Sequence, residues 1–296
     1  MSSKLVMKSM IGFYIFLFFL YLFGPLLVMS VTAFNTPNYP TALPFEGFTL
    51  GWFPKLWNDR QMMDGLWNSF IIGFGVVAIS VPVGLAAAII MGQIYHRARS
   101  LFYLVTISPV LTPGVIIGIS TVIFWKDVLS VTDVTKAVFY KGIVLSIFGQ
   151  SSFVAAYCLL IIMARLQRFD RAQEEAALDL GASYPQVFWH ILLPFLKPAL
   201  ISASVIAFLS SFENYNTTTF AILADKTLTT VLAGRVRQGT TPAISALAVV
   251  IIAVSIVGAI AFEIVRRKEE RRLKAQSDAA ARAELADELV GTGVAH

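Results

Sequence analysis

The sequence has 296 residues, of which 57% are hydrophobic and only 14% are charged, and its mean hydropathy is +0.73. Soluble domains carry about 25% charged residues, so this composition excludes an ordinary water-soluble enzyme or binding domain and indicates an integral membrane protein. The net charge of +5 does not predict a nucleic-acid partner, because the basic residues flank apolar segments instead of forming one patch. The single cysteine, Cys158, excludes an internal disulfide.

Six apolar segments are each long enough for a helix that crosses a bilayer, which needs about 20 residues. They predict an all-α membrane protein with six transmembrane helices, at residues 10–34, 70–91, 101–125, 142–164, 198–223 and 243–265. A cleavable signal peptide is the alternative interpretation of the first segment. Its apolar core is too long for one, so we predict a retained span, with a kink at Gly24 and Pro25.

Polar segments separate the predicted spans. The one after the first span, residues 35–66, contains four prolines together with Trp52 and Trp57, which are expected as anchors at the membrane surface. The other features are a basic turn with His96, Arg97 and Arg99, two prolines that break the third span at Pro109 and Pro113, and a polar loop at residues 126–141.

The distribution of positive charge orients the chain, because Lys and Arg concentrate on the cytoplasmic side of short membrane loops. With the N-terminus inside, fifteen of the 23 Lys and Arg residues fall on the cytoplasmic side and eight on the external side. Both termini are therefore predicted to be cytoplasmic. Residues 266–296, rich in Arg, Glu and Ala, are predicted to form a charged cytoplasmic tail after a transmembrane domain at residues 1–265.

The polar interval between the fourth and fifth predicted spans is patterned as two short helices joined at a glycine. Asp170 can cap the first helix, and Gln173 completes a capping-box pattern three residues later. Gly181 is expected to end this helix in the left-handed conformation. Ser183 begins the second helix, and Pro194 is expected to end it. These patterns alone leave two alternatives open, an amphipathic connector on the membrane surface and a docking surface for another protein.

The same interval also matches the pattern E-A-A, three residues, G, nine residues and I-x-L-P. The matching residues are Glu175, Ala176, Ala177, Gly181, Ile191, Leu193 and Pro194. The interval therefore resembles the cytoplasmic loop of permease subunits of binding-protein-dependent ABC importers. The resemblance implies that residues 165–197 contain a coupling helix that docks on a separate ATPase subunit. It also implies a bacterial inner-membrane complex with an ATPase dimer that uses ATP and Mg, a second homologous permease and an external substrate-binding protein.

The sequence shows no pattern for chemistry of its own. No Gly is followed directly by Lys, which excludes a P-loop for nucleotide phosphates. The three histidines, His96, His190 and His296, are far apart and lack metal-ligand spacing. We therefore expect a translocation subunit that binds no cofactor or metal and is not an enzyme.

Glu213 is the one ionisable residue well inside a predicted span. A carboxylate at membrane depth is costly, so it either bonds a neighbouring helix or lies on a substrate path. Asn214 and the threonines that follow make the segment polar, and Phe212 and Tyr215 offer ring faces to a cation. These four residues are the predicted substrate path.

Parts of the sequence also resemble permeases of the spermidine/putrescine type. They are Phe34-Asn35, Gly47-Phe48-Thr49-Leu50, Trp67-Asn68-Ser69 and the segment around Glu213. The resemblance implies that the solute is a polyamine or a related cationic compound. In that family a pair of acidic residues is common at the last segment, and here Asn214 replaces the second one. This departure removes one negative charge, so import of iron or a small anion is the alternative.

An ATP-independent secondary transporter is the competing class of function, with Glu213 as a proton relay. Such a protein would show inverted repeats or more ionisable residues inside its spans. The sequence shows neither.

Reporter fusions or cysteine labelling after Lys55, Lys136, Asp225 and Arg282 test the predicted topology. We expect the first three positions outside and the last in the cytoplasm, because of the distribution of positive charge and the six apolar segments. A cytoplasmic signal at Asp225 would contradict this topology, since it adds or removes a span after the motif loop.

Overall fold

The computed structural model describes residues 3–129 and 140–258, with four further positions at 260, 263, 264 and 267. The described residues are largely helical, and the β-type pairing among them is an isolated bridge between Asn35 and Phe48. The predicted all-α class is confirmed. The chain divides into two compact units, residues 59–239 and residues 1–58 with 240–296.

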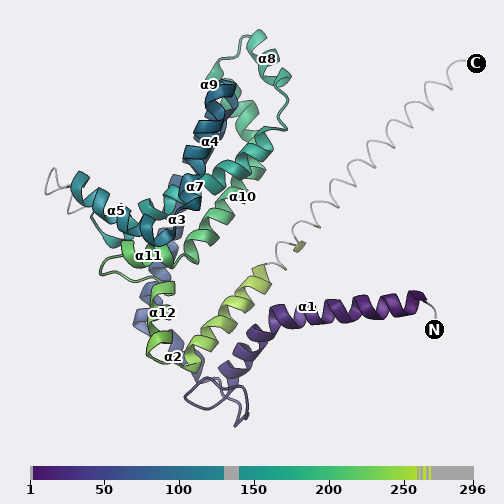
Figure 1. Cartoon of the computed structure of the whole chain (residues 1–296), viewed down its shortest axis with the longest axis vertical. Helices are drawn as coiled ribbons and strands as arrows, with labels where there is room; N and C mark the ends of the chain where they lie inside the picture. Colours follow the sequence, from purple (N-terminus) through teal and green to yellow (C-terminus); the bar gives the residue numbers. More distant parts are fainter. Residues whose placement is uncertain (1–2, 130–139, 259, 261–262, 265–266, 268–296) are drawn as a thin grey trace, which may run out of the picture. The chain divides into compact units, whose positions relative to one another are not determined.

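The unit formed by the two ends of the chain contains α1 (Ser3–Phe34), α2 (Trp52–Trp57) and a helix at Pro242–Gly258. The buried Thr32 hydroxyl donates to the Ser245 hydroxyl at 2.8 Å, which joins α1 to the last helix. Pro25 lies inside α1, and the ribbon of α1 changes direction along its length (Figure 1), as the sequence predicts.

Asn35 orders the segment between α1 and α2. Its buried side chain donates hydrogen bonds to the carbonyls of Thr41 and Pro44, at 3.0 and 3.2 Å. The Trp52 indole donates to the Asn35 carbonyl at 2.8 Å, and Trp52 is only 6% exposed. Trp52 is therefore a buried residue of this unit and not the surface anchor that the sequence predicts, because its indole N–H has a partner inside the protein. Trp57 is 77% exposed.

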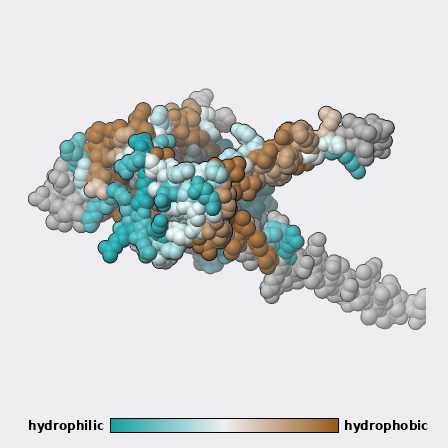
Figure 2. Space-filling model, turned by 90° about the horizontal axis from the view of Figure 1, so that it is seen from below, coloured by the Kyte–Doolittle hydropathy of each residue, from teal (hydrophilic) through white to brown (hydrophobic). Residues whose placement is uncertain are grey.

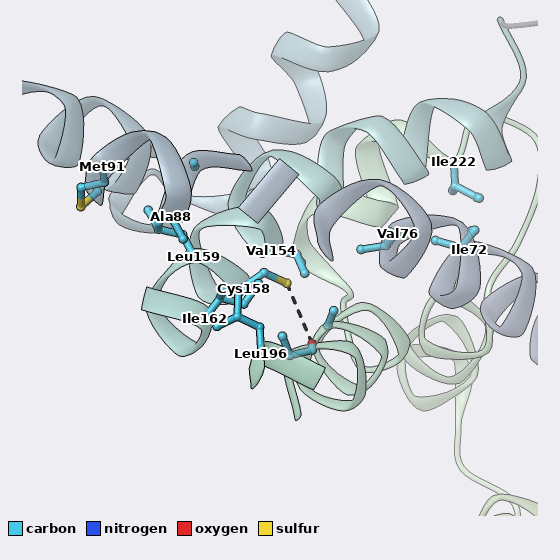
Figure 3. Packing of buried hydrophobic residues seen from close by; sticks show 13 residues of the cluster. Ile72, Val76, Ala88, Met91, Val154, Cys158, Leu159, Ile162, Leu196 and Ile222 are labelled. Carbon is cyan, nitrogen blue, oxygen red and sulfur yellow. Dashed lines mark hydrogen bonds between the residues drawn. The ribbon is translucent and has the colours of Figure 1, made fainter. Parts of the chain in front are cut away.

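The unit at residues 59–239 is built around three long helices, α3 (Arg60–Gln93), α7 (Gly142–Leu166) and α10 (Leu193–Phe212). Their apolar side chains meet in one buried cluster (Figure 3). Val76 of α3 and Leu196 of α10 are both inaccessible to solvent within it. Burial of this kind provides most of the packing between the three helices.

Gly84 permits a close approach of α3 to α7. A Cβ at Gly84 would lie 2.5 Å from the Cβ of Cys158 and 2.8 Å from the backbone nitrogen of Leu159. Small residues allow this kind of backbone contact between membrane helices. The Cys158 thiol in turn points towards the Ala203 carbonyl of α10, at 3.9 Å (Figure 3). A larger residue at position 84 would therefore push the helices apart.

α4 (His96–Leu111) and α5 (Gly114–Leu129) meet at a bend of 102° within the span predicted at residues 101–125, at the second of the two prolines expected to break it. The bend falls at Thr112 and Pro113. Proline lacks the backbone N–H and disfavours a helical conformation in the residue before it, which explains the break. The predicted basic turn is the beginning of α4.

Two shorter helices, α11 (Asn216–Ala221) and α12 (Leu228–Gln238), also belong to this unit. α11 packs on α5 where Gly118 leaves room for its backbone, because a Cβ there would lie 2.5 Å from the Thr217 carbonyl. Ser69 of α3 accepts a hydrogen bond from the Leu228 backbone nitrogen at 3.0 Å and so holds the start of α12.

Among the described residues, four helices are long and apolar enough to cross a membrane, Met7–Phe34, Arg60–Gln93, Gly142–Leu166 and Tyr184–Phe212. The bent pair α4 and α5 is a fifth candidate, and the helix at Pro242–Gly258 is shorter. Described helical residues lie at each of the six predicted positions, but the count of six spans is not confirmed. Most of the predicted polar loop at residues 126–141 and of the predicted tail at residues 266–296 lies outside the described residues.

Exposed apolar side chains cover broad areas of the helices (Figure 2). In α1 nearly every large apolar residue is exposed, including Phe13 at 64% and Leu27 at 61%. Surfaces of this extent are covered by lipid or by partner proteins.

Candidate functional site

The motif loop begins with α8 (Ala172–Asp179), which ends at Gly181 as the sequence predicts. Gly181 has a φ of +88°, a left-handed conformation in which other residues are strained. Its backbone nitrogen donates to the Leu178 carbonyl at 2.9 Å, and that of Ala182 donates to the Ala177 carbonyl at 3.0 Å. This pair of hydrogen bonds is a Schellman motif, which fixes the end of α8.

The side chains around the two helix starts are arranged nearly as predicted. Asp170 accepts a hydrogen bond from the Ala172 backbone nitrogen at 3.0 Å, although the residue at the N-cap position of α8 is Arg171. After the glycine turn, the Gln186 side chain accepts from the Ser183 backbone nitrogen at 2.7 Å, as in a capping box. Both helix starts therefore have local side-chain partners.

The second half of the motif loop is the beginning of a long helix, not a short helix that Pro194 ends. α9 (Tyr184–Val187), the π-helical η1 (Phe188–Leu192) and α10 follow without a break, so one helix runs over Tyr184–Phe212. The predicted stop is wrong because Pro194 lies in the first turn after η1. The wide turn of a π-helix accommodates a residue that cannot donate the usual backbone hydrogen bond.

The exposed face of α8 is centred on Ala176. Glu175 and Ala176 are exposed, Ala177 is half-buried, and Leu180 just after the helix is 90% exposed. Figure 1 shows α8 and α9 at the end of their unit that is opposite α11 and α12. A small side chain at the centre of an exposed face lets another protein surface approach closely. The remaining motif residues are Ile191 and Leu193, both half-buried, and Pro194, which is exposed.

Arg171 links the start of α8 to the end of α3. Its Nη2 donates to the Gly92 carbonyl at 3.0 Å, in the last turn of α3. A cation at a helix C-terminus satisfies a free carbonyl and interacts favourably with the helix dipole. A displacement of α8 therefore acts directly on α3.

The segment predicted as one span at residues 198–223 is broken at Glu213. α10 ends at Phe212, and the Asn214 side-chain oxygen accepts from the backbone nitrogens of Thr217 and Thr218, at 3.1 and 3.2 Å. An Asn side chain that bonds the backbone ahead of it starts a new helix, here α11, which explains the break. Glu213 is exposed, and its carboxylate has no hydrogen bond or ion pair to any described residue.

The two aromatic residues of the predicted substrate path have partners within the unit. The ring of Phe212 lies 5.3 Å from that of Phe70 and 5.8 Å from that of Phe208. The Tyr215 hydroxyl accepts from Arg237 Nη2 at 3.1 Å. Of the four predicted path residues, Glu213 is the one whose functional group is left without a contact in the described part of the chain.

Gln150 forms hydrogen bonds with residues on both sides of the break between α10 and α11. The sequence patterns did not predict this role. This α7 residue is 1% exposed; its Nε2 donates to the Thr218 hydroxyl at 2.7 Å, and its Oε1 accepts from the Ser211 hydroxyl. Ser211 lies in α10 and Thr218 in α11. A Gln inside an apolar span was the only available signal, because an amide in that position needs partners.

Known proteins resemble this chain in sequence and fold. The family described as "Binding-protein-dependent transport system inner membrane component" matches residues 80–273. The chain is 30% identical to the putrescine transport system permease protein PotI of Escherichia coli K12, over 86% of this chain and 90% of PotI. It is 24% identical to the spermidine/putrescine transport system permease protein PotC of Haemophilus influenzae, over 86% and 95% of the two chains.

A solved structure shares the fold. It is a bacterial ABC transporter involved in the import of the acidic polysaccharide alginate, with a TM-score of 0.64, 18% identity, and coverage of 88% of this chain and 93% of that one. The protein is thus a helical membrane permease with the fold of an ABC importer subunit. It belongs to the family of binding-protein-dependent transport system inner membrane components, which confirms the predicted family.

Its relatives are transport components and not enzymes. Among the described residues, no three His, Cys, Asp or Glu side chains lie close enough together to hold a metal ion.

Replacing Gln150 by Leu tests the link across the break. We expect the free energy of unfolding to fall by about 1–3 kcal/mol, because the buried Ser211 hydroxyl loses its hydrogen bond to Gln150 and the Thr218 hydroxyl keeps only its bonds to Asn214. Thermal unfolding of the purified chain in detergent measures the effect. Ser152→Ala is the matched control, since the Ser152 hydroxyl bonds only the carbonyl of Gly149 in its own helix. Equal unfolding temperatures for Gln150→Leu and the control would contradict the structural importance of this link.

Proposed function

We propose that the chain is the permease subunit of an ATP-driven importer and forms part of the translocation path for a polyamine or a related cationic solute. The observation that carries the proposal is the exposed turn formed by α8 and Gly181, which we call the proposed coupling turn. It carries the family motif at Glu175, Ala176, Ala177 and Gly181, in a chain 30% identical to a putrescine permease. The proposed partners are an ATPase dimer that uses ATP and Mg, a second homologous permease and an external substrate-binding protein.

The exposed face of α8 is the proposed contact with the ATPase. Ala176 at its centre adds almost no bulk, and Gly181 has open space around the position of a Cβ. Both features favour a close fit of α8 into a groove. In this proposal residues 165–197 are cytoplasmic, both termini are cytoplasmic, and the domain at residues 1–265 lies in the bacterial inner membrane.

The proposed role of Glu213 is to stabilise positive charge on the solute as it passes the break between α10 and α11. Two observations support it over a structural role within this chain. The carboxylate is exposed, and no described residue forms an ion pair with it.

The neighbouring Asn214 uses its side-chain oxygen as the cap of α11, a function that an Asp at the same position would also perform. The single carboxylate therefore favours a solute of lower positive charge, such as a diamine.

The coupling proposal is tested by replacing the central alanine of α8. Ala176→Asp puts a charge into the proposed contact, so we expect the ATPase subunit to co-purify at least about tenfold less, a loss of about 1.4 kcal/mol. Ala224→Asp is the control, because Ala224 is also exposed but lies in the segment predicted to be external. Undiminished co-purification of the ATPase with Ala176→Asp would remove α8 from the interface.

The same assay separates contact from backbone conformation at Gly181. Gly181→Asn retains a residue that tolerates the left-handed conformation, whereas Gly181→Arg adds both strain and bulk. We expect the ATPase subunit to co-purify less with Gly181→Arg than with Gly181→Asn.

The substrate proposal is tested by a matched pair of changes at the break. Glu213→Gln keeps the shape and removes the charge, so transport of putrescine by the reconstituted complex is expected to slow about tenfold, which corresponds to about 1.4 kcal/mol. Assembly and basal ATP hydrolysis are expected to persist. Asn214→Asp keeps the cap of α11 and adds the second charge, so it is expected to raise transport of spermidine relative to putrescine.

Three outcomes distinguish the alternatives. Normal transport by Glu213→Gln removes this carboxylate from the mechanism. Loss of assembly assigns Glu213 a structural contact with the second permease. Transport of phosphate or ferric iron, with no transport of amines by the wild-type complex, overturns the substrate class and leaves the importer proposal intact.

A further inference from the structure

A cavity with both apolar and charged residues in its lining lies between α8 and the ends of the long helices. It has a volume of about 220 Å³ and is lined by residues of α3, α4, α7, α8 and η1, among them Gln93, Arg99, Gln167, Arg171 and Glu174. This volume corresponds to about seven waters at about 30 Å³ each. The cavity therefore has room for a phosphate group with a small substituent.

The two arginines give this cavity its charge. Arg171 uses one nitrogen to hold the Gly92 carbonyl, which fixes its guanidinium at the cavity and leaves its other N–H groups free. Arg99 makes no ion pair with a described residue. Glu174 is the one carboxylate in the lining, and no described ion pair joins it to either arginine. The lining thus carries a net charge of +1, in a form that suits a phosphate diester.

A second, largely apolar groove adjoins the cavity. It has a volume of about 410 Å³ and is lined by Met91, Arg99, Ser100, Tyr103, Leu104 and Met163. The groove shares Arg99 and Met163 with the cavity, so the two hollows meet at these residues. Leu104 is 60% exposed, which opens the groove to the surroundings of the helices. A free anion gains nothing from contact with such an apolar groove, whereas an acyl chain buries apolar surface in it.

The cavity is separate from the proposed ATPase contact. At about 100° per residue, Arg171 and Glu174 lie roughly 140–160° around α8 from Ala176. An occupant of the cavity would therefore support α8 from behind without blocking its exposed face.

We propose that this composite hollow binds an anionic glycerophospholipid, with the phosphate between Arg99 and Arg171 and an acyl chain along Tyr103 and Leu104. The inference rests on the proposed function in one respect, the cytoplasmic side of the motif loop. Basic pockets between membrane helices on that side bind anionic headgroups. The bound lipid holds α8, α3 and α4 together, so the lipid composition of the membrane sets how firmly the proposed coupling turn is attached.

The test measures lipid retained by the full chain, purified from membranes in detergent with the subunits that accompany it. The chain is incubated with equal amounts of phosphatidylglycerol and phosphatidylcholine of the same acyl chains, and bound lipid is counted by native mass spectrometry. We expect phosphatidylglycerol to be retained about fivefold or more over phosphatidylcholine, because charge-assisted bonds to phosphate and the surplus positive charge favour it.

Arg99→Gln and Arg171→Gln are each expected to abolish this preference. Arg168→Gln is the matched control, since Arg168 is an exposed arginine of the same loop and does not line the cavity. Arg171→Gln also removes the hydrogen bond to the Gly92 carbonyl and could destabilise the protein for that reason. Arg99→Gln removes no described hydrogen bond or ion pair, so its effect on lipid retention can be interpreted independently. Retained preference in Arg99→Gln, or an equal loss in Arg168→Gln, overturns the proposal.

Two further arms separate a lipid from a free anion. Ser100→Trp fills the groove and is expected to lower phosphatidylglycerol retention, whereas inorganic phosphate is expected to displace the lipid poorly. Efficient displacement by inorganic phosphate together with no effect of Ser100→Trp assigns the cavity to a free anion and overturns the lipid assignment. The assay contains no ATP and no transported solute, so its failure is distinguishable from failure of the importer proposal, which shows in the ATPase and transport assays.

Discussion

The close approach of α3 to α7 is the constraint on which the rest of this unit depends. Because Gly84 leaves no side chain between them, the two backbones lie close enough for α10 to pack against both. α3 then carries an attachment near each end. Near its start Ser69 holds the beginning of α12, and near its end the Gly92 carbonyl receives Arg171. The proposed coupling turn and the region opposite it are thus both fixed to one helix.

Local rules in the sequence predicted much of this fold. Length and hydropathy located the helices, since a long apolar run has few alternatives in a membrane. The end of α8 was predictable because Gly181 is the residue type that the left-handed position requires. The prediction at Pro194 failed because a proline stops a helix only when the preceding turn cannot widen, and the π-helical η1 shows that this one does.

The break at Glu213 shows what the sequence alone could not predict. Hydropathy alone does not show where a side chain accepts backbone hydrogen bonds and so interrupts a helix. The Asn214 oxygen does this, and α11 starts at that point. The residue that holds the break, Gln150, is 61 residues from Ser211 and 68 from Thr218 along the chain. Contacts over such separations depend on how α7, α10 and α11 pack, which no local pattern encodes. The free carboxylate of Glu213 follows from the same packing.

The continuous helix over Tyr184–Phe212 has a mechanical consequence. Its 29 residues start directly after the Gly181 turn and end beside Glu213, and at 1.5 Å per residue it is about 43 Å long. A helix of this length acts as a stiff lever, so tilting one end by about 5° displaces the other by about 4 Å. A movement of α8 would therefore reach the break at Glu213 along this helix, whose regular geometry is interrupted by the wide turn of η1 and by Pro198 inside α10.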